Sequence, residues 1–93
     1  MRSVEYTNSF KRCIKRVLAG RYKDIVEEDL PEVVHKLAND IQLPSKYKDH
    51  ALTGNWINHR DCHIRPDLIL IYRKIGDKEL YLVEIGNHSE IFG

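Results

Sequence analysis

Residues 67–74 read DLILIYRK, and this run decides the fold class of the chain. Five consecutive apolar residues make both faces of a strand apolar, which is typical of an interior strand that is covered on both sides. Residues 75–78, IGDK, predict a turn. Strands are therefore expected on either side of the run, at residues 58–65 and 79–86. The second half of the chain is predicted to form an antiparallel three-stranded meander.

The first half begins with an alternating segment at residues 3–7, which predicts a short strand. Thr7 or Asn8 can cap a helix that ends near Gly20. Its buried face is predicted from apolar residues at helical spacing, which are Phe10, Ile14, Val17 and Leu18.

A second helix is predicted from a capping signal. Asp29 is followed three positions later by Glu32, and Pro31 suits a first helical turn. Whether residues 24–28 add a turn in front of this signal stays open. Pro44 ends the helical region, and residues 45–54 are expected to form a loop. The predicted fold is α+β in the order β-α-α-β-β-β, with two helices on one face of a mostly antiparallel four-stranded sheet.

The length and charge of the chain limit the classes of function that it can have. The 93 residues suffice for a single domain, residues 1–93. Residues 1–23 carry a net charge of +6 and residues 24–45 a net charge of −5, so the total of +1 gives no general nucleic-acid signal. No secretory signal or membrane span is visible, so a soluble cytoplasmic protein with two free cysteines is expected.

The strand at residues 58–65 carries an unusual polar face. Alternation places four of its side chains on one face, which must be solvated or functional because burial would be costly: His59, Asp61, His63 and Arg65. A metal site on this face, completed by His50 or His88, is a weaker alternative. Same-face side chains spread over ~13 Å from one residue to the fourth after it, whereas one ion needs ligands about 2 Å away.

Three further features are candidates for binding or packing. A basic stripe on the first helix is either a solvated face or a partner surface, and comprises Lys11, Arg12, Lys15 and Arg16. Trp56 is expected in the core. The C-terminal tail can fold back over the sheet and bring His88 and the aromatic Phe92 to the polar face, where a base would stack on the ring.

Three segments together carry a resemblance to a known family: YKDHALTGNW at residues 47–56, RDCHIRPDLILIY at residues 60–72 and GNHSEIFG at residues 86–93. From residue 44 onward the chain resembles the YafQ-type toxins of the RelE/ParE superfamily, and the first half matches them only in pattern. The resemblance implies a small fold with the helices on one face of the sheet and the active site on the other.

The resemblance also implies a ribosome-dependent messenger RNA endonuclease, the toxin half of a bacterial type II toxin–antitoxin pair. The implied catalytic residues are His50, His63, Asp67 and His88, and Phe92 would contact the RNA. Other expected substrate contacts are Lys48, Arg60, Asp61 and Arg65, whereas His59 departs from the family pattern and receives no role. Because RNA supplies its own 2′-OH nucleophile, neither a metal nor another cofactor is expected, and the products would be a 2′,3′-cyclic phosphate and a 5′-OH.

The implied partners are a cognate antitoxin that wraps the toxin, the ribosome and its messenger RNA, with no membrane. The basic first helix is a possible dock for an acidic antitoxin segment. Two other function classes stay open at this point: a ParE-like inhibitor of DNA gyrase with no nuclease activity, and a metal-dependent hydrolase.

Overall fold

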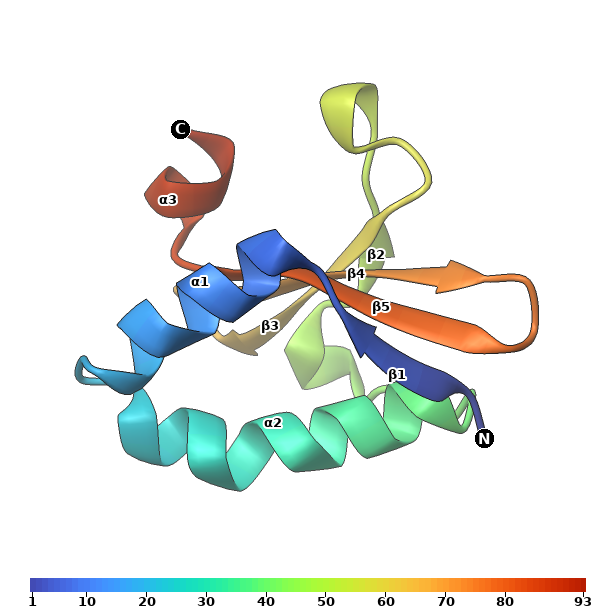
Figure 1. Cartoon of the computed structure of the whole chain (residues 1–93), viewed down its shortest axis with the longest axis horizontal. Helices are drawn as coiled ribbons and strands as arrows, with labels where there is room; N and C mark the ends of the chain where they lie inside the picture. Colours follow the sequence, from blue (N-terminus) through green and yellow to red (C-terminus); the bar gives the residue numbers. More distant parts are fainter.

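The computed structural model of the chain describes residues 1–93 and contains one five-stranded sheet and three α-helices (Figure 1). In chain order the elements are β1 (Ser3–Tyr6), α1 (Asn8–Leu18), α2 (Lys23–Ala38), β2 (His50–Ala51), β3 (Arg60–Arg65), β4 (Leu68–Ile75), β5 (Glu79–Gly86) and α3 (His88–Phe92). Two 3-10 turns flank β2, η1 (Ser45–Tyr47) and η2 (Gly54–Trp56). None of the helices has the length and apolar character of a membrane-spanning segment. The predicted α+β class is confirmed.

The sheet has the strand order β1-β5-β4-β3-β2. The apolar strand β4 lies between β3 and β5 and is antiparallel to both, while β1 joins the far edge parallel to β5. The expected count of four strands was wrong, because β2 lies inside the segment that was expected to be a loop. This strand pairs His50 with Asp61 and Ala51 with Arg60. Two residues are too few to show an alternating pattern, so β2 could not be predicted.

Helix α1 begins as predicted. The Thr7 hydroxyl oxygen accepts a hydrogen bond from the backbone N–H of Phe10 at 3.0 Å, and this satisfies one of the free donors at the helix start. Phe10 and Val17 on the apolar face are buried in the core.

Helix α2 begins at Lys23, two turns before the predicted start, so the proposed capping box was wrong. Pro31 lies inside the helix and removes one backbone hydrogen bond. Burial of the early turns offsets this loss, since Val26 is only 4% exposed. The carboxylate of Asp29 does not cap a helix and instead pairs with Arg65 of β3 at 2.8 Å.

Both faces of the central strand are covered. The main core lies between α1, α2 and one face of the sheet, and it includes Leu68 and Leu70 of β4. Ile69 and Ile71 alternate with these residues and are also fully buried, although they lie outside that core. On the side of the sheet away from α2, Figure 1 shows α3 and the loop that contains η2. These two segments therefore frame the second face.

The C-terminal tail is a capped helix. The Asn87 side chain accepts from the Glu90 N–H, and the Glu90 carboxylate accepts from the Asn87 N–H, both at 2.8 Å. A side chain at Gly86 would place its Cβ 2.9 Å from the Glu90 carboxylate, so a larger residue there would displace this capping side chain. The tail does turn back toward the sheet, but as the capped helix α3.

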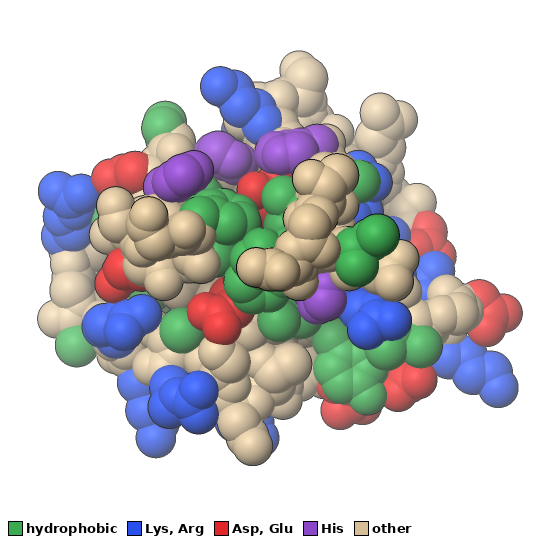
Figure 2. Space-filling model, turned by 90° about the horizontal axis from the view of Figure 1, so that it is seen from above, with side chains coloured by type: hydrophobic (Ala, Val, Ile, Leu, Met, Phe, Trp, Pro, Cys, Tyr) green, Lys and Arg blue, Asp and Glu red, His purple; other side chains and the backbone are tan.

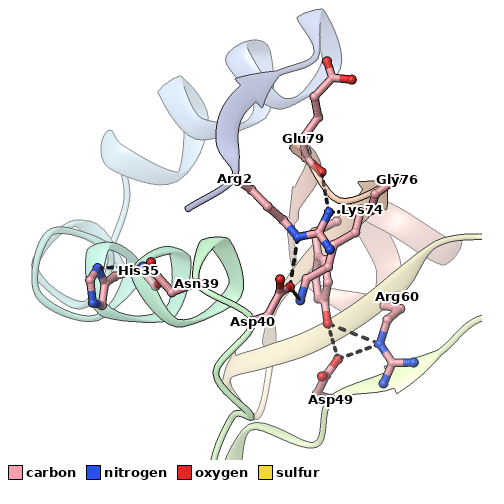
Figure 3. Close-up of polar contacts among 10 residues, drawn as sticks. Arg2, His35, Asn39, Asp40, Asp49, Arg60, Lys74, Gly76 and Glu79 are labelled. Carbon is pink, nitrogen blue, oxygen red and sulfur yellow. Dashed lines mark hydrogen bonds and ion pairs between the residues drawn. The ribbon is translucent and has the colours of Figure 1, made fainter.

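The N-terminus is tied to the far edge of the sheet (Figure 3). Arg2 donates to Asp40 at 2.9 Å and to the carbonyl of Gly76 at 2.7 Å, and Lys74 donates to Asp40 at 2.7 Å. The hydrogen bonds from Lys74 and Arg2 lower the pKa of Asp40 to about 2. This cluster joins the end of α2 to β4 and the turn that follows it, at a distance from the polar face.

Candidate active site

One ring nitrogen of His50 is hydrogen-bonded to a backbone carbonyl and lies close to a buried carboxylate oxygen that has no hydrogen-bond partner. Its Nδ1 lies 2.9 Å from the carbonyl oxygen of Lys48 and 3.0 Å from the carboxylate of Asp61. A nitrogen that faces two acceptors carries the hydrogen, so Nε2 of the neutral ring keeps its lone pair. More than half of the His50 side chain is exposed. The arrangement therefore offers solvent or substrate a proton acceptor of defined orientation.

Asp61 is buried beneath this imidazole, with only 3% of its surface exposed. Of the two alternatives predicted for the polar face, solvated or functional, the solvated one does not hold for this residue. Burial raises the pKa of Asp61 above the usual aspartate value, and the two histidines His50 and His63 act in the opposite direction. A buried carboxylate beside an imidazole stabilises the ring when it takes up a proton.

His63 is the third member of this group. It lies two residues after Asp61 on β3, on the face opposite the core residues Cys62 and Ile64. Its ring centroid is 6.5 Å from that of His50. Figure 2 shows that imidazoles gather on this side of the molecule. The structure thus brings two of the three predicted catalytic histidines together around one buried carboxylate.

His88 is carried by α3 at the other end of the same face. Its ring packs on Phe92 at 5.0 Å between centroids, and Phe92 packs edge-on against Trp56 at 6.3 Å. The predicted core position of Trp56 was wrong, because the residue is half-buried and links α3 to the η2 loop. The His59 ring also packs against Trp56, at 5.4 Å between centroids. Aromatic rings therefore line the side of the face where a base would stack.

His59 is not part of β3. Asn58 has a left-handed backbone with φ of 69°, and the strand begins only at Arg60. His59 consequently leaves the row formed by Asp61 and His63. No group of three or more His, Cys, Asp or Glu side chains is placed to hold a metal ion. The donor set proposed for the metal alternative does not assemble.

Asp67 lies in the turn between β3 and β4 and faces the helices. Arg21 of the α1–α2 connection donates to its carboxylate at 3.0 Å. A hydrogen bond from Tyr22 and the guanidinium of Arg21 hold the pKa of Asp67 below its usual range. Both side chains of this ion pair are more than half exposed.

Arg60 is already paired with protein groups. Its Nε–H lies 3.3 Å from both the Asp49 carboxylate and the Tyr72 hydroxyl, and that hydroxyl donates to Asp49 at 2.6 Å (Figure 3). Burial and the neighbouring Asp49 carboxylate raise the pKa of Tyr72. This cluster fixes the residue that precedes His50 to the centre of the sheet.

The remaining predicted cations differ in availability. Arg65 is bound to Asp29 of α2, so its charge is partly neutralised. Lys48 has no carboxylate within ion-pair distance, and with His63 and Arg65 it lines a pocket of about 300 Å³. Of the cations proposed to contact RNA, Lys48 is the one without an acidic partner.

Sequence reasoning missed the supporting residues Asp49, Tyr72 and Glu90. The Tyr72 hydroxyl lies at the end of an apolar run and needs a buried partner, which was a readable signal. Asn87 followed three positions later by Glu90 is a capping-box pattern that was equally readable. The hydrogen-bond partner of Tyr72 could not be predicted, because Asp49 directly precedes strand β2, which was not predicted.

The whole chain matches one protein family. A family model described as the bacterial toxin of type II toxin–antitoxin system, YafQ, matches residues 2–93. The chain belongs to the YafQ toxin family. The mRNA interferase toxin YafQ of Escherichia coli K12 is 39% identical over 93 residues, covering 99% of this chain and 97% of the relative. The family resemblance found in the motifs is confirmed.

Solved YafQ-family structures share the fold. YafQ in the E. coli DinJ–YafQ complex has a TM-score of 0.85 and 38% identity, covering all of both chains. A metal-bound toxin from Helicobacter pylori has a TM-score of 0.84 and 37% identity, covering 99% of this chain and all of that one. This member of the YafQ family therefore has the architecture of toxins solved alone and with an antitoxin.

Proposed function

We propose that this chain cleaves messenger RNA on the ribosome, as the toxin of a type II toxin–antitoxin pair, by acid–base catalysis without a metal. The single observation that carries the proposal is the placement of His50. Its Nδ1 lies within 3.0 Å of both the buried Asp61 carboxylate and the Lys48 carbonyl, so the exposed Nε2 is free to act as a base. The E. coli relative is named an mRNA interferase.

The first proton transfer is assigned to His50. Its Nε2 takes the proton of the ribose 2′-OH, and the oxygen attacks the adjacent phosphorus. The positive charge that appears on the imidazole is stabilised by Asp61, in the way a buried carboxylate supports a catalytic histidine. Positioned proton transfer of this kind contributes about 10²–10⁴-fold to rate.

The second proton transfer is assigned to His88. As the bond between phosphorus and the 5′-oxygen breaks, the departing oxygen takes a proton from this imidazole. The products are a 2′,3′-cyclic phosphate and a 5′-OH, so atoms and charge balance without an added reagent. His63, whose ring is 6.5 Å from that of His50, is placed to stabilise charge on the phosphoryl oxygens.

Asp67 and Phe92 complete the proposed set. Asp67 is joined to Arg21 by an ion pair in which both side chains are more than half exposed. Such pairs are weak, so RNA can displace Arg21 from the carboxylate. Phe92 and Trp56 present half-buried rings whose faces suit stacking with a base of the codon.

The partners follow from the same assignment. A site that is open on one face of a small chain needs its substrate held in place, and the ribosome holds the message in the cytoplasm. A cognate antitoxin would keep the toxin inactive, as DinJ accompanies YafQ in the E. coli complex. The exposed basic residues Lys11, Arg12 and Lys15 on α1 suit an acidic antitoxin segment.

The proposal is tested by reporter-message cleavage with translating ribosomes. His50→Ala, His63→Ala and His88→Ala should each cut at least about 100-fold more slowly than the wild type. His35→Ala, a change on α2 away from the site, is the matched control and should cut normally. Wild-type rates in all three variants would refute the assignment, and inhibition of DNA supercoiling without cleavage would favour the gyrase-inhibitor alternative.

A further inference from the structure

A basic pocket adjoins His63 on the side facing η1. It has a volume of about 300 Å³, and none of the residues that line it is acidic. One wall comes from η1 and the residue after it, the other from the end of β3. The lining includes Lys46, Tyr47, Lys48, His63 and Arg65.

The two lysines of this pocket have no acidic partner. No carboxylate lies within 4.0 Å of the ammonium of Lys46 or Lys48. The Lys46 ammonium lies over the Tyr47 ring at 5.1 Å from its centroid. Arg65 is compensated by its pair with Asp29, so the excess positive charge comes from the lysines. Unpaired cations that surround a hollow favour an anion in it.

The wall that carries these lysines is fixed. Tyr47 is only 6% exposed and anchors η1 in the core. Lys48 adopts a left-handed backbone with φ of 49° and ψ of 44°, which is unfavourable for a residue with a side chain. Its N–H donates to the Ser45 carbonyl at 3.0 Å, and the next residue, Asp49, is bound by Tyr72. Local strain that the surroundings maintain in this way is common at ligand sites.

We infer that this pocket binds a backbone phosphate of RNA next to the scissile linkage. The inference rests on the proposed function and extends it. His63 lines the pocket, and its ring is also 6.5 Å from that of His50. One RNA strand can therefore place consecutive phosphates on either side of His63. Lysine binds phosphate as a point charge without reading a base, so the contact holds RNA independently of its sequence.

The first test uses inorganic phosphate and the ¹H–¹⁵N NMR spectrum of the whole chain. Phosphate, titrated at constant ionic strength against chloride, should shift the amide signals of Lys46, Tyr47 and Lys48 in a saturable way. Lys46→Ala should weaken the apparent affinity about tenfold, the effect of losing one charge-assisted contact. Lys78→Ala, an equal change of charge in the turn after β4, should leave it unchanged. Shifts spread evenly over all basic residues would mean that no pocket exists.

The second test uses a short single-stranded RNA with 2′-O-methyl groups, which lacks the nucleophile and cannot be cut. Binding to Lys46→Ala should weaken about tenfold relative to wild type, and the slope of log K against log salt should flatten by about 0.7. Binding of the variant to ribosomes without message is measured in parallel. Weaker binding to the short RNA assigns the phosphate to the message, whereas weaker binding to the ribosomes alone assigns it to ribosomal RNA. An unchanged salt slope in both arms overturns the inference.

These tests are independent of catalysis. If wild-type protein binds the uncleavable RNA through the pocket but cuts no message, the nuclease proposal fails and the phosphate site stands. If messages are cut but the Lys46 variant binds as tightly as wild type, the nuclease proposal stands and the phosphate site fails. Tighter saturation by polyglutamate than by RNA at equal charge would indicate an acidic protein partner and would also overturn the inference.

Discussion

His50 and His88 lie on two segments that are held in place by opposite kinds of contact. The β2 segment, residues 48–50, is tied to groups that are almost fully buried, since Tyr72 is 1% exposed and Asp61 is 3% exposed. The α3 segment, residues 86–93, is tied to α1 by the pair between Arg16 and Glu90 at 3.1 Å, in which the side chains are 59% and 34% exposed. Buried hydrogen bonds fix geometry, whereas exposed ion pairs are weak and easily exchanged.

This difference indicates that the proposed base is held rigidly, whereas the proposed acid can be adjusted. The base assigned to the β2 segment is held in place before RNA arrives, because its Nδ1 already faces both acceptors. The acid assigned to α3 stands on a five-residue helix whose contacts are its own cap, a surface ion pair and aromatic rings. Stacking of a base on Phe92 can therefore adjust α3, and with it His88, without disturbing the sheet.

The largest effect on this comparison is expected from Asp61→Asn. Asparagine keeps the shape but removes the charge that stabilises the imidazolium of His50. Cleavage should fall about tenfold, the cost of one hydrogen bond to a charged group. The loss is limited because the Lys48 carbonyl, at 2.9 Å, still holds the Nδ1 hydrogen. Single-turnover cleavage on ribosomes measures it, with Asp77→Asn in the exposed β4–β5 turn as the control.

The same substitution should stabilise the fold at neutral pH. Burial raises the pKa of Asp61 in the folded state above its unfolded value of about 3.9. The stability that this group contributes is therefore fully present below about pH 4 and is lost as the pH rises through the folded pKa. Asp61→Asn should melt at a higher temperature than wild type at pH 7, and the difference should vanish toward pH 4. Equal melting curves at both pH values would show that Asp61 is not strained by burial.

A smaller effect on cleavage, with a clear cost in stability, is expected from Tyr72→Phe. The change leaves the Asp49 carboxylate without its 2.6 Å donor in a half-buried position. About 1–2 kcal/mol of unfolding free energy should be lost, which lowers the melting temperature by roughly 4–12 °C in a domain of this size. Cleavage should fall a few-fold as the segment before His50 loosens. Tyr6→Phe, at an exposed ring, should change neither quantity.

Much of the fold was predictable because long periodic patterns dominate it. The apolar run in β4 and the amphipathic face of α1 are such patterns. The start of α2 was misplaced because tertiary burial of Val26 prevailed over a local signal at Pro31. Strand β2 was invisible because its two residues pair only through the long-range register of His50 with Asp61.

The candidate site residues remain a prediction, and their contacts could not be predicted from the sequence. The family resemblance proposed His50 and His63, yet it could not say that the Asp61 carboxylate would be buried beside them. The partner of Asp67 was also out of reach, because Arg21 comes from a turn 46 residues away in the sequence. Residue types show which chemistry is available, whereas the pairing of charges depends on how the elements pack.

The smallest effect is expected where α3 meets α1, and it tests whether the surface pair positions His88. Glu90→Gln keeps the capping-box acceptor but removes the charge that binds Arg16. Glu90→Gln and Arg16→Gln should each lower kcat about two- to threefold at low salt, with the melting temperature unchanged within about 2 °C. Because both changes break one interaction, the double variant should be no slower than either single variant. Arg12→Gln on the same helix is the control. If the two losses multiply instead, the residues act separately, and the aromatic contacts of Phe92 alone hold α3 in place.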